Sequence, residues 1–261
     1  MKFVTSDNVR LDYTDEGTGQ PIVLLSGLGS YKEIWNLTKR FLLQNGYRVI
    51  CLDERNQGSS EHTIHGRRIS RHGMDLNELM SHLQIKQFVG VGNSMGAATL
   101  FSYVSLVGTA KLAALIDIDQ SPKMISDDTW KFGFKGLGWA DYPQALKLPL
   151  DKANVNPVDD ETYELVNKAR EAHPYDRELN FPLRVDHTAQ DWRDVVQSLD
   201  VPFLVMAGEN SPYFDAKFAE VTASIAKKGE STVIGNCGHL VMVEQPNEFN
   251  QRLLKFLNEN S

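Results

Sequence analysis

The stretch Phe88–Val104, FVGVGNSMGAATLFSYV, contains a short apolar run, a Gly-x-Ser-x-Gly sequence and then an apolar pattern with helical spacing. The run is typical of a buried strand and the pattern of a helix, so Ser94 falls in the turn between them. This turn has two interpretations: it only reverses the chain, as many Gly/Ser turns do, or it presents a nucleophile. The sequence on both sides of the turn distinguishes the two.

Strand-like and helix-like runs alternate along the rest of the chain. Besides residues 87–93, the sequence predicts strands at residues 10–17, 21–27, 47–53, 112–119, 201–208 and 231–235. It predicts helices at residues 31–46, 70–84, 95–108 and 246–257. Continuous apolar runs that alternate with helices predict a mostly parallel sheet with helices on both faces. We therefore expect an α/β fold.

The alternation stops between the strand that ends near Asp119 and the strand that starts near Pro202. Residues 121–191 are too many for a loop without structure of its own. The sequence predicts that they form a helical cap subdomain, inserted into a single domain that spans residues 1–261. A largely apolar pocket is expected beneath this cap. The candidates for its lining are Trp130, Phe134, Trp139 and Leu240.

A catalytic serine needs a base, because its hydroxyl is a poor nucleophile until its proton is removed. In a parallel sheet, sites form at the carboxyl ends of the strands. Ser94 follows one predicted strand and His239 follows the last one. His239 is alternatively a buried structural residue, but this order and placement favour catalysis. The remaining histidines lack the placement and are expected to be structural or solvated: His62, His65, His72, His82, His173 and His187.

An ester-cleaving serine also needs hydrogen-bond donors for the oxyanion that forms on the substrate. The backbone N–H of Met95 comes with the turn at Ser94. A second donor is expected in the loop after the first apolar strand, LLSGLGSY, where Leu28 follows Gly27. Taken alone this loop is only a turn, and its place after a strand is what makes the Leu28 N–H a candidate.

Composition excludes several classes of partner. The net charge of −7 argues against nucleic acid and anionic membranes, which select basic surfaces. No run is long enough to span a bilayer, and the polar start of the chain lacks a signal sequence, so a cytoplasmic location is expected. Cys51 and Cys237 are expected to be free thiols. No cluster of Cys and His has metal-ligand spacing, so neither a metal nor another cofactor is expected.

With these motifs in this order, the chain resembles the α/β-hydrolase superfamily, in the branch of small esterases, cofactor-free haloperoxidase-like enzymes and lactonases. The motifs are SGLGSYKEIW, DERNQGSS, GNSMG and GHLVMVEQP. The resemblance covers nearly the whole chain, with the predicted cap as the least comparable part, and it implies that Asp53 and Arg55 brace the loop beside Ser94. Ser26 stands where family members usually have histidine. The backbone N–H of Leu28 is still expected to serve as a donor despite this difference.

The acid that would orient His239 departs from the family's usual pattern. The resemblance implies an aspartate after the penultimate strand, but AGENSPYFD has Ser211 at that place. Some relatives carry the acid one strand earlier, where this chain has Asp117 and Asp119. Asp117 is expected to lie within the strand, so we predict Asp119 as the acid. Asp215 and Glu209 remain alternatives.

The sequence thus predicts a serine hydrolase that cleaves small to medium carboxylic esters with Ser94, His239 and Asp119, using Leu28 and Met95 as oxyanion donors and no cofactor. The same three residues are compatible with cleavage of lactones, thioesters or carbon–carbon bonds, or with perhydrolysis that gives haloperoxidase activity. A protein that has lost catalysis and uses the pocket as a receptor is the alternative outside enzymes.

Overall fold

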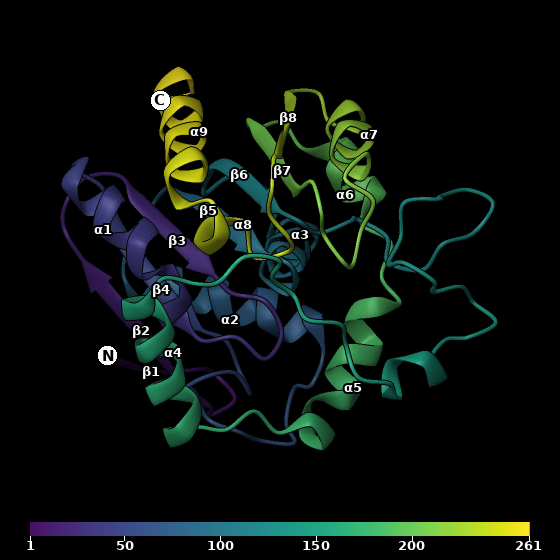
Figure 1. Ribbon diagram of the computed structural model, residues 1–261. Coiled ribbons are helices and arrows are strands. Elements are labelled where there is room, and N and C mark those ends of the chain that lie inside the picture. Colours follow the sequence, from purple (N-terminus) through teal and green to yellow (C-terminus); the bar gives the residue numbers. More distant parts are fainter. Residues whose placement is uncertain (261) are drawn as a thin grey trace.

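An eight-stranded sheet forms the centre of the protein in a computed structural model that describes residues 1–260 (Figure 1). Within these residues the strand order is β1-β2-β4-β3-β5-β6-β7-β8. Strand β2 is antiparallel to its neighbours β1 and β4, and all other neighbouring pairs are parallel. The strands are β1 (Lys2–Val4), β2 (Arg10–Glu16), β3 (Pro21–Leu25), β4 (Arg48–Asp53), β5 (Phe88–Asn93), β6 (Leu112–Ile118), β7 (Phe203–Gly208) and β8 (Gly229–Ile234). The predicted mostly parallel α/β sheet is confirmed.

Burial on both faces explains why the central strands are continuous apolar runs. In β3, Ile22 and Leu24 face one core cluster, and Val23 and Leu25 face the other. Alternate side chains point to opposite faces of a sheet, so a strand covered on both sides must be apolar at every position. The edge strand β1 was not predicted from sequence, because three residues are too few to show a pattern.

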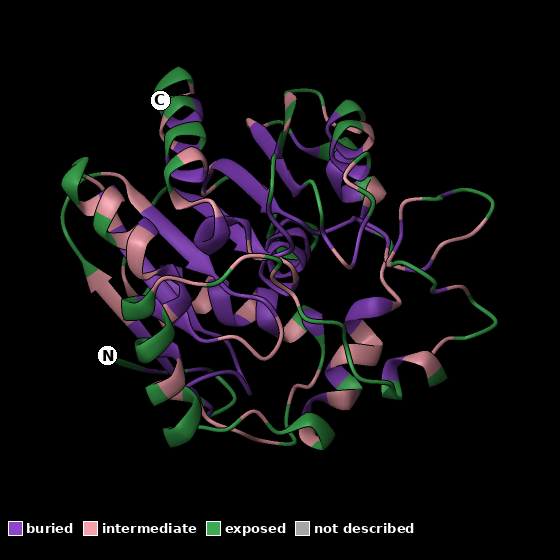
Figure 2. Ribbon diagram, viewed as in Figure 1, coloured by how far each residue is buried: buried purple, intermediate pink, exposed green. Residues whose placement is uncertain are grey.

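Helices cover both faces of the sheet, and the buried interior lies between the layers (Figure 2). One face packs against α2 (Ile69–His82), α3 (Met95–Val107), α6 (Arg193–Ser198) and α7 (Phe218–Ile225). The other face packs against α1 (Asn36–Gln44), α8 (Val241–Glu244) and α9 (Pro246–Glu259), with the short 3₁₀ helix η1 (Lys32–Trp35) before α1. The four predicted helices are α1, α2, α3 and α9.

The segment between β6 and β7 contributes the remaining helices. They are the 3₁₀ helix η2 (Gln144–Lys147), α4 (Asp160–Ala172) and α5 (Arg177–Thr188). Side chains of Asp159 and Asp176 cap α4 and α5 by accepting hydrogen bonds from backbone N–H groups of the first turn. Residues 121–143 are mostly irregular, with isolated bridges such as Lys123 with Asp191. The segment leaves the sheet after β6 and returns through α6 (Figure 1).

Both cysteines are buried and free, as predicted. Burial raises the pKa of Cys51 and of Cys237 to about 12. Of the helices in residues 1–260, none is long and apolar enough to cross a membrane.

Candidate active site

Ser94 occupies the sharp turn between β5 and α3. Its backbone has φ 55° and ψ −123°, a conformation that non-glycine residues adopt rarely and at a cost of about 1–3 kcal/mol. The turn is held in place because the Ser94 N–H donates to the Ile118 carbonyl at 3.0 Å. The strained turn presents the side chain of Ser94 to a pocket at the N-terminus of α3.

Two glycines make this turn possible. A Cβ on Gly92 would lie under 3.0 Å from backbone atoms of Gly96 and Ala97. A Cβ on Gly96 would lie equally close to the backbone of Leu25 in β3. Strand and helix approach so closely that only hydrogen fits at either position, which is why the motif reads Gly-x-Ser-x-Gly.

Gly92→Ala should therefore destabilise the protein by at least about 1–3 kcal/mol, the usual cost of overpacking, because the obstructing atoms are backbone. Chemical denaturation measures the free energy of unfolding. Gly235→Ala is the matched control, because its Cβ would meet only the Glu209 carboxylate at 3.8 Å. Equal stability of the two variants would contradict the close approach of β5 and α3.

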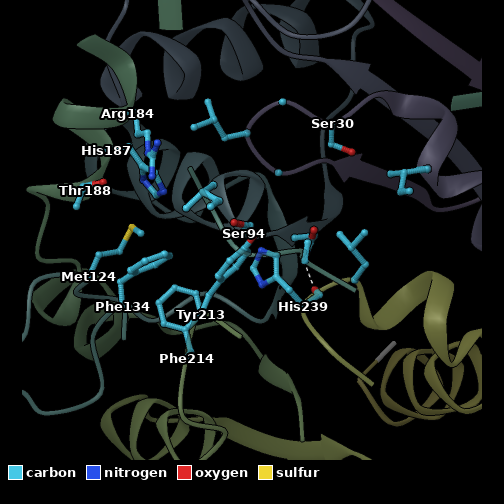
Figure 3. A pocket seen from close by; sticks show the side chains of 18 of the residues that line it. Ser30, Ser94, Met124, Phe134, Arg184, His187, Thr188, Tyr213, Phe214 and His239 are labelled. Carbon is cyan, nitrogen blue, oxygen red and sulfur yellow. Dashed lines mark hydrogen bonds between the residues drawn. The ribbon is translucent and has the colours of Figure 1, made fainter. Parts of the chain in front are cut away.

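His239 lies in the loop between β8 and α8. Its N–H donates to the Ala153 carbonyl at 2.8 Å, and its carbonyl accepts from Asn93 Nδ2 at 3.1 Å. The ring packs edge-on against Tyr213, with centroids 4.6 Å apart. Contacts with the inserted segment and with β5 thus hold the backbone of His239, and the loop after β7 holds its ring. His239 and Ser94 line the same pocket, and Figure 3 shows both side chains pointing into it.

Asp119 contacts the ring of His239. Its Oδ2 lies 2.6 Å from His239 Nδ1, and both side chains are buried. The backbone of Asp119 has φ 53°, so it turns just after β6 and its N–H donates to the Met206 carbonyl at 2.8 Å. Its Oδ1 accepts from the Gly208 N–H at 3.1 Å. These bonds fix the carboxylate beside the imidazole.

The other acids lie elsewhere. Asp117 is the penultimate residue of β6 and is fully buried. Burial, together with the nearby Asp119 charge, raises the pKa of Asp117 well above its usual value. Asp215 is exposed and accepts a hydrogen bond from the Lys217 N–H. Glu209 is exposed and accepts from the Asn236 N–H. None of these three carboxylates has a hydrogen bond to His239 within residues 1–260.

Ser211 lies against Asp119 rather than in its place. Its hydroxyl donates to Asp119 Oδ2 at 2.6 Å, and its oxygen accepts from the backbone N–H groups of Tyr213 and Phe214 at 3.3 and 3.4 Å. Ser211, which stands where the family usually has its acid, therefore helps to hold the carboxylate of Asp119, which follows the neighbouring strand β6.

The N–H groups of Leu28 and Met95 are both free to bind an anion. Within residues 1–260 neither donates a hydrogen bond. Met95 is the first residue of α3, where N–H groups have no partner in the helix and favour negative charge. Leu28 lies in a tight turn whose ends meet through a bond from the Ser30 N–H to the Gly27 carbonyl at 3.0 Å.

Gln57, which was not predicted from the sequence as a functional residue, connects the loop that carries Leu28 to the inserted segment. Gln57 Oε1 accepts from the Gly29 N–H at 2.7 Å, and Gln57 Nε2 donates to Asn180 Oδ1 in α5 at 2.9 Å. Gln57 belongs to the DERNQGSS motif, which is the only signal in the sequence that points to it. Asn93, which holds His239, precedes Ser94 in its motif and was missed in the same way.

Asp53 and Arg55, from the same motif, anchor different parts of the structure. Asp53 accepts from the backbone and side-chain nitrogens of Lys32, both at 2.7 Å, and so holds the start of η1 after the Leu28 loop. Arg55 is fully buried and pairs with Asp75 of α2 and with Asp7. Neither residue lines the pocket that contains Ser94.

The pocket is a cavity of about 230 Å³ between the strand ends and the inserted segment. Of the four residues proposed from sequence as its lining, Phe134 and Leu240 line it, and Leu28 lines it as well. Trp130 and Trp139 do not line it, in contrast to the expectation from sequence. Trp130 is buried away from the pocket, where its indole N–H donates to Ser121 Oγ at 3.0 Å.

Trp139 lies on the outside of the inserted segment. Its side chain is 53% exposed and packs edge-on against Tyr142. The pocket is instead walled by side chains from several elements, including Met124, Leu146, Val166, Tyr213 and Phe214. Within residues 1–260 no group of three His, Cys, Asp or Glu side chains is placed to hold a metal ion.

Comparison with known proteins agrees with this architecture. A model of the alpha/beta hydrolase family matches residues 22–252. A non-heme haloperoxidase of Rhodococcus erythropolis is 26% identical over 272 residues, which cover 98% of this chain and 99% of the relative.

Solved structures show the same fold. An esterase from Exiguobacterium antarcticum superposes with a TM-score of 0.85 at 21% identity, over 98% of both chains. A bromoperoxidase from Bacillus anthracis superposes with a TM-score of 0.83 at 21% identity, over 96% of both chains. The elbow at Ser94, the sheet order and the match over most of the sequence place this chain in the alpha/beta hydrolase family.

Proposed function

We propose that this protein hydrolyses small to medium carboxylic esters through an acyl-enzyme on Ser94. The observation that carries the proposal is the 2.6 Å contact between Asp119 and His239, in the same pocket as a serine held in a strained turn. A buried carboxylate on Nδ1 leaves Nε2 of the imidazole to act on the serine. The serine at the elbow argues against epoxide hydrolase and haloalkane dehalogenase activity, which on this fold typically require an aspartate there.

In the proposed mechanism, Ser94 Oγ attacks the carbonyl carbon of the ester while His239 Nε2 takes its proton. The negative charge moves to the former carbonyl oxygen, where the Leu28 and Met95 N–H groups stabilise it. Collapse of this intermediate breaks the carbon–oxygen bond, and the imidazolium gives its proton to the departing alcohol. A water molecule, deprotonated by His239, then releases the acid and regenerates Ser94.

The inserted segment, residues 121–191, acts as a cap in this proposal. It supplies one side of the pocket with Met124, Phe134 and Leu146, and Ala153 fixes the backbone of His239. A cap excludes bulk water from the site, which strengthens the hydrogen bonds to the oxyanion.

A fluorophosphonate probe tests the proposal directly, because it reacts only with an activated serine. We expect one label per chain, located on Ser94 by peptide mass spectrometry. Absence of labelling, together with no hydrolysis of short 4-nitrophenyl esters, would instead support a protein that binds a ligand without catalysis.

The size of the pocket predicts a preference for short acyl chains. A cavity of about 230 Å³ that is walled by aromatic and aliphatic side chains holds a small or medium acyl group. We expect kcat/KM for 4-nitrophenyl esters to peak at short to medium chains and to fall for long ones, without activation by a lipid–water interface. Faster hydrolysis of emulsified long-chain lipid than of short soluble esters would contradict this.

Perhydrolysis is the second candidate, favoured by the similarity to the non-heme haloperoxidase over nearly the full chain. Hydrogen peroxide would replace water in the attack on the acyl-enzyme, giving a peracid that oxidises halide in solution. Bromination that requires a carboxylic acid, peroxide and an intact Ser94 distinguishes this activity from direct halide oxidation.

A further inference from the structure

The pocket carries positive charge in a protein whose net charge is −7. Among the described residues that line it, the Lys and Arg side chains are those of Arg170 and Arg184, and none is an aspartate or glutamate. Arg170 is exposed and its guanidinium contacts Asn167 of the same helix. Arg184 is half-buried in the wall. An anionic ligand would therefore meet attraction here in spite of the overall charge.

Arg184 has no partner for its charge. Within residues 1–260 its guanidinium makes neither an ion pair nor a hydrogen bond, although burial lowers its pKa from the usual value. By contrast, the fully buried Arg55 contacts two carboxylates. Partly burying an unpaired guanidinium costs free energy, so its presence at this position points to a partner that arrives with the ligand.

Two neighbours of Arg184 on the same face of α5 also lack hydrogen-bond partners. His187 and Thr188 follow Arg184 by three and four positions, which is the spacing that puts helical side chains side by side. Both are buried, both line the pocket, and His187 Nδ1 and Thr188 Oγ1 have no partner in residues 1–260. Buried polar atoms are normally hydrogen-bonded. Figure 3 shows Arg184, His187 and Thr188 together on the side of the pocket away from His239.

The combined charge of Arg184, His187 and Thr188 is complementary to that of a carboxylate. Burial lowers the pKa of His187 to about 4, so its ring is neutral at pH 7 and offers one N–H. The Thr188 hydroxyl is a further neutral donor. The group therefore has one positive charge, from Arg184, whose planar fork pairs with both oxygens of a carboxylate. The rest of the wall is largely apolar, including Met124, Phe134 and Leu146, and suits the carbon chain between two functional groups.

We propose that Arg184, with His187 and Thr188, forms a subsite for a carboxylate on the substrate, so that the preferred esters are monoanionic. This deepens the proposed function and rests on it for the ester bond. The ester carbonyl lies at Ser94, while the carboxylate of the same molecule binds across the pocket at Arg184. The carboxylate belongs either to the acyl part, as in a half-ester of a dicarboxylic acid, or to the alcohol part.

Matched ester pairs test the subsite and locate the carboxylate. The acyl arm compares the 4-nitrophenyl half-ester of glutaric acid with 4-nitrophenyl valerate, which has an acyl chain of equal length. The alcohol arm compares 4-carboxyphenyl butyrate with 4-carbamoylphenyl butyrate. In each arm, the ratio of kcat/KM for the anionic ester to kcat/KM for the neutral ester measures the preference for a carboxylate. In one of the two arms, Arg184→Gln should lower this ratio about tenfold or more, because the charged hydrogen-bonded pair between Arg184 and the carboxylate is lost. Arg184→Lys should retain part of the ratio.

Arg252→Gln is the control, because it removes the same charge from an exposed residue of α9 that does not line the pocket. It should leave the ratio unchanged in both arms. A ratio that is unchanged in Arg184→Gln in both arms, or that falls equally in Arg252→Gln, would overturn the subsite.

Binding separates failure of the subsite from failure of the proposed function. In Ser94→Ala the half-ester should bind, measured by calorimetry, and the added change Arg184→Gln should weaken that binding about tenfold or more. Binding that depends on Arg184 in a protein without esterase activity would uphold the subsite and reject the ester hydrolase. Esterase activity with binding that is indifferent to Arg184 would reject the subsite alone.

Discussion

Ser94→Ala should lower kcat for short 4-nitrophenyl esters by at least about 10⁴-fold, since no other group can form the acyl-enzyme. The fold should survive, because alanine keeps the Cβ and loses only a hydroxyl that has no hydrogen bond within residues 1–260. Steady-state kinetics and thermal unfolding measure the two effects. Ser30→Ala is the control, since Ser30 lines the same pocket and has no role in the mechanism.

His239→Ala should lose about as much activity as Ser94→Ala, and the double variant little more, because residues that act as a unit have non-additive effects. Retention of most of the activity in either single variant would refute the proposed mechanism. So would losses that multiply in the double variant, since they would indicate independent roles.

Asp119→Asn should lower kcat by about 10⁴-fold, the loss known for the equivalent change in a serine protease. Asparagine keeps the shape of the side chain. Its amide can donate to His239 Nδ1, which places the ring proton on Nε2, and a protonated Nε2 cannot accept the proton of Ser94. The missing charge also removes stabilisation of the imidazolium. Kinetics at saturating substrate measure the effect.

Asp215→Asn is the matched control for this change. Asp215 is exposed and lies in the loop where the family usually places the acid, and its carboxylate accepts a hydrogen bond from the nearby Lys217 N–H. We expect its variant to hydrolyse esters at nearly the normal rate. A near-normal rate for Asp119→Asn, or a large loss for Asp215→Asn, would show that the contact between Asp119 and His239 does not orient the base.

Much of the fold could be predicted because it is encoded in short stretches of sequence. A strand buried on both faces is apolar along its length, as β3 is. The apolar residues of a helix that covers it recur every three to four positions. The turn at Ser94 is equally local, because Gly92 and Gly96 are needed wherever strand and helix approach this closely. The placement of His239 after the last parallel strand follows from chain order alone.

The inserted segment could not be predicted at the same level of detail. Its first half is mostly irregular, so no periodic pattern shows which side chains face inward. Trp130 and Trp139 are equally apolar in sequence, yet one is buried against Ser121 and the other is exposed. Contacts with residues far along the chain decide such positions, as the pairing of Lys123 with Asp191 illustrates.

By itself, the sequence determined the α/β alternation, the elbow serine and the histidine after the last strand, since each of these features depends on residues that are close together in the sequence. It favoured Asp119 as the acid beside the histidine, with three other acids as alternatives. Only the tertiary structure decided that Asp119 contacts His239, because that contact requires the bend at φ 53° and the bonds to Met206 and Gly208 on the neighbouring strand. Packing likewise determined that Arg184 lies in the pocket without a carboxylate partner, because only the folded chain shows which basic side chains form ion pairs.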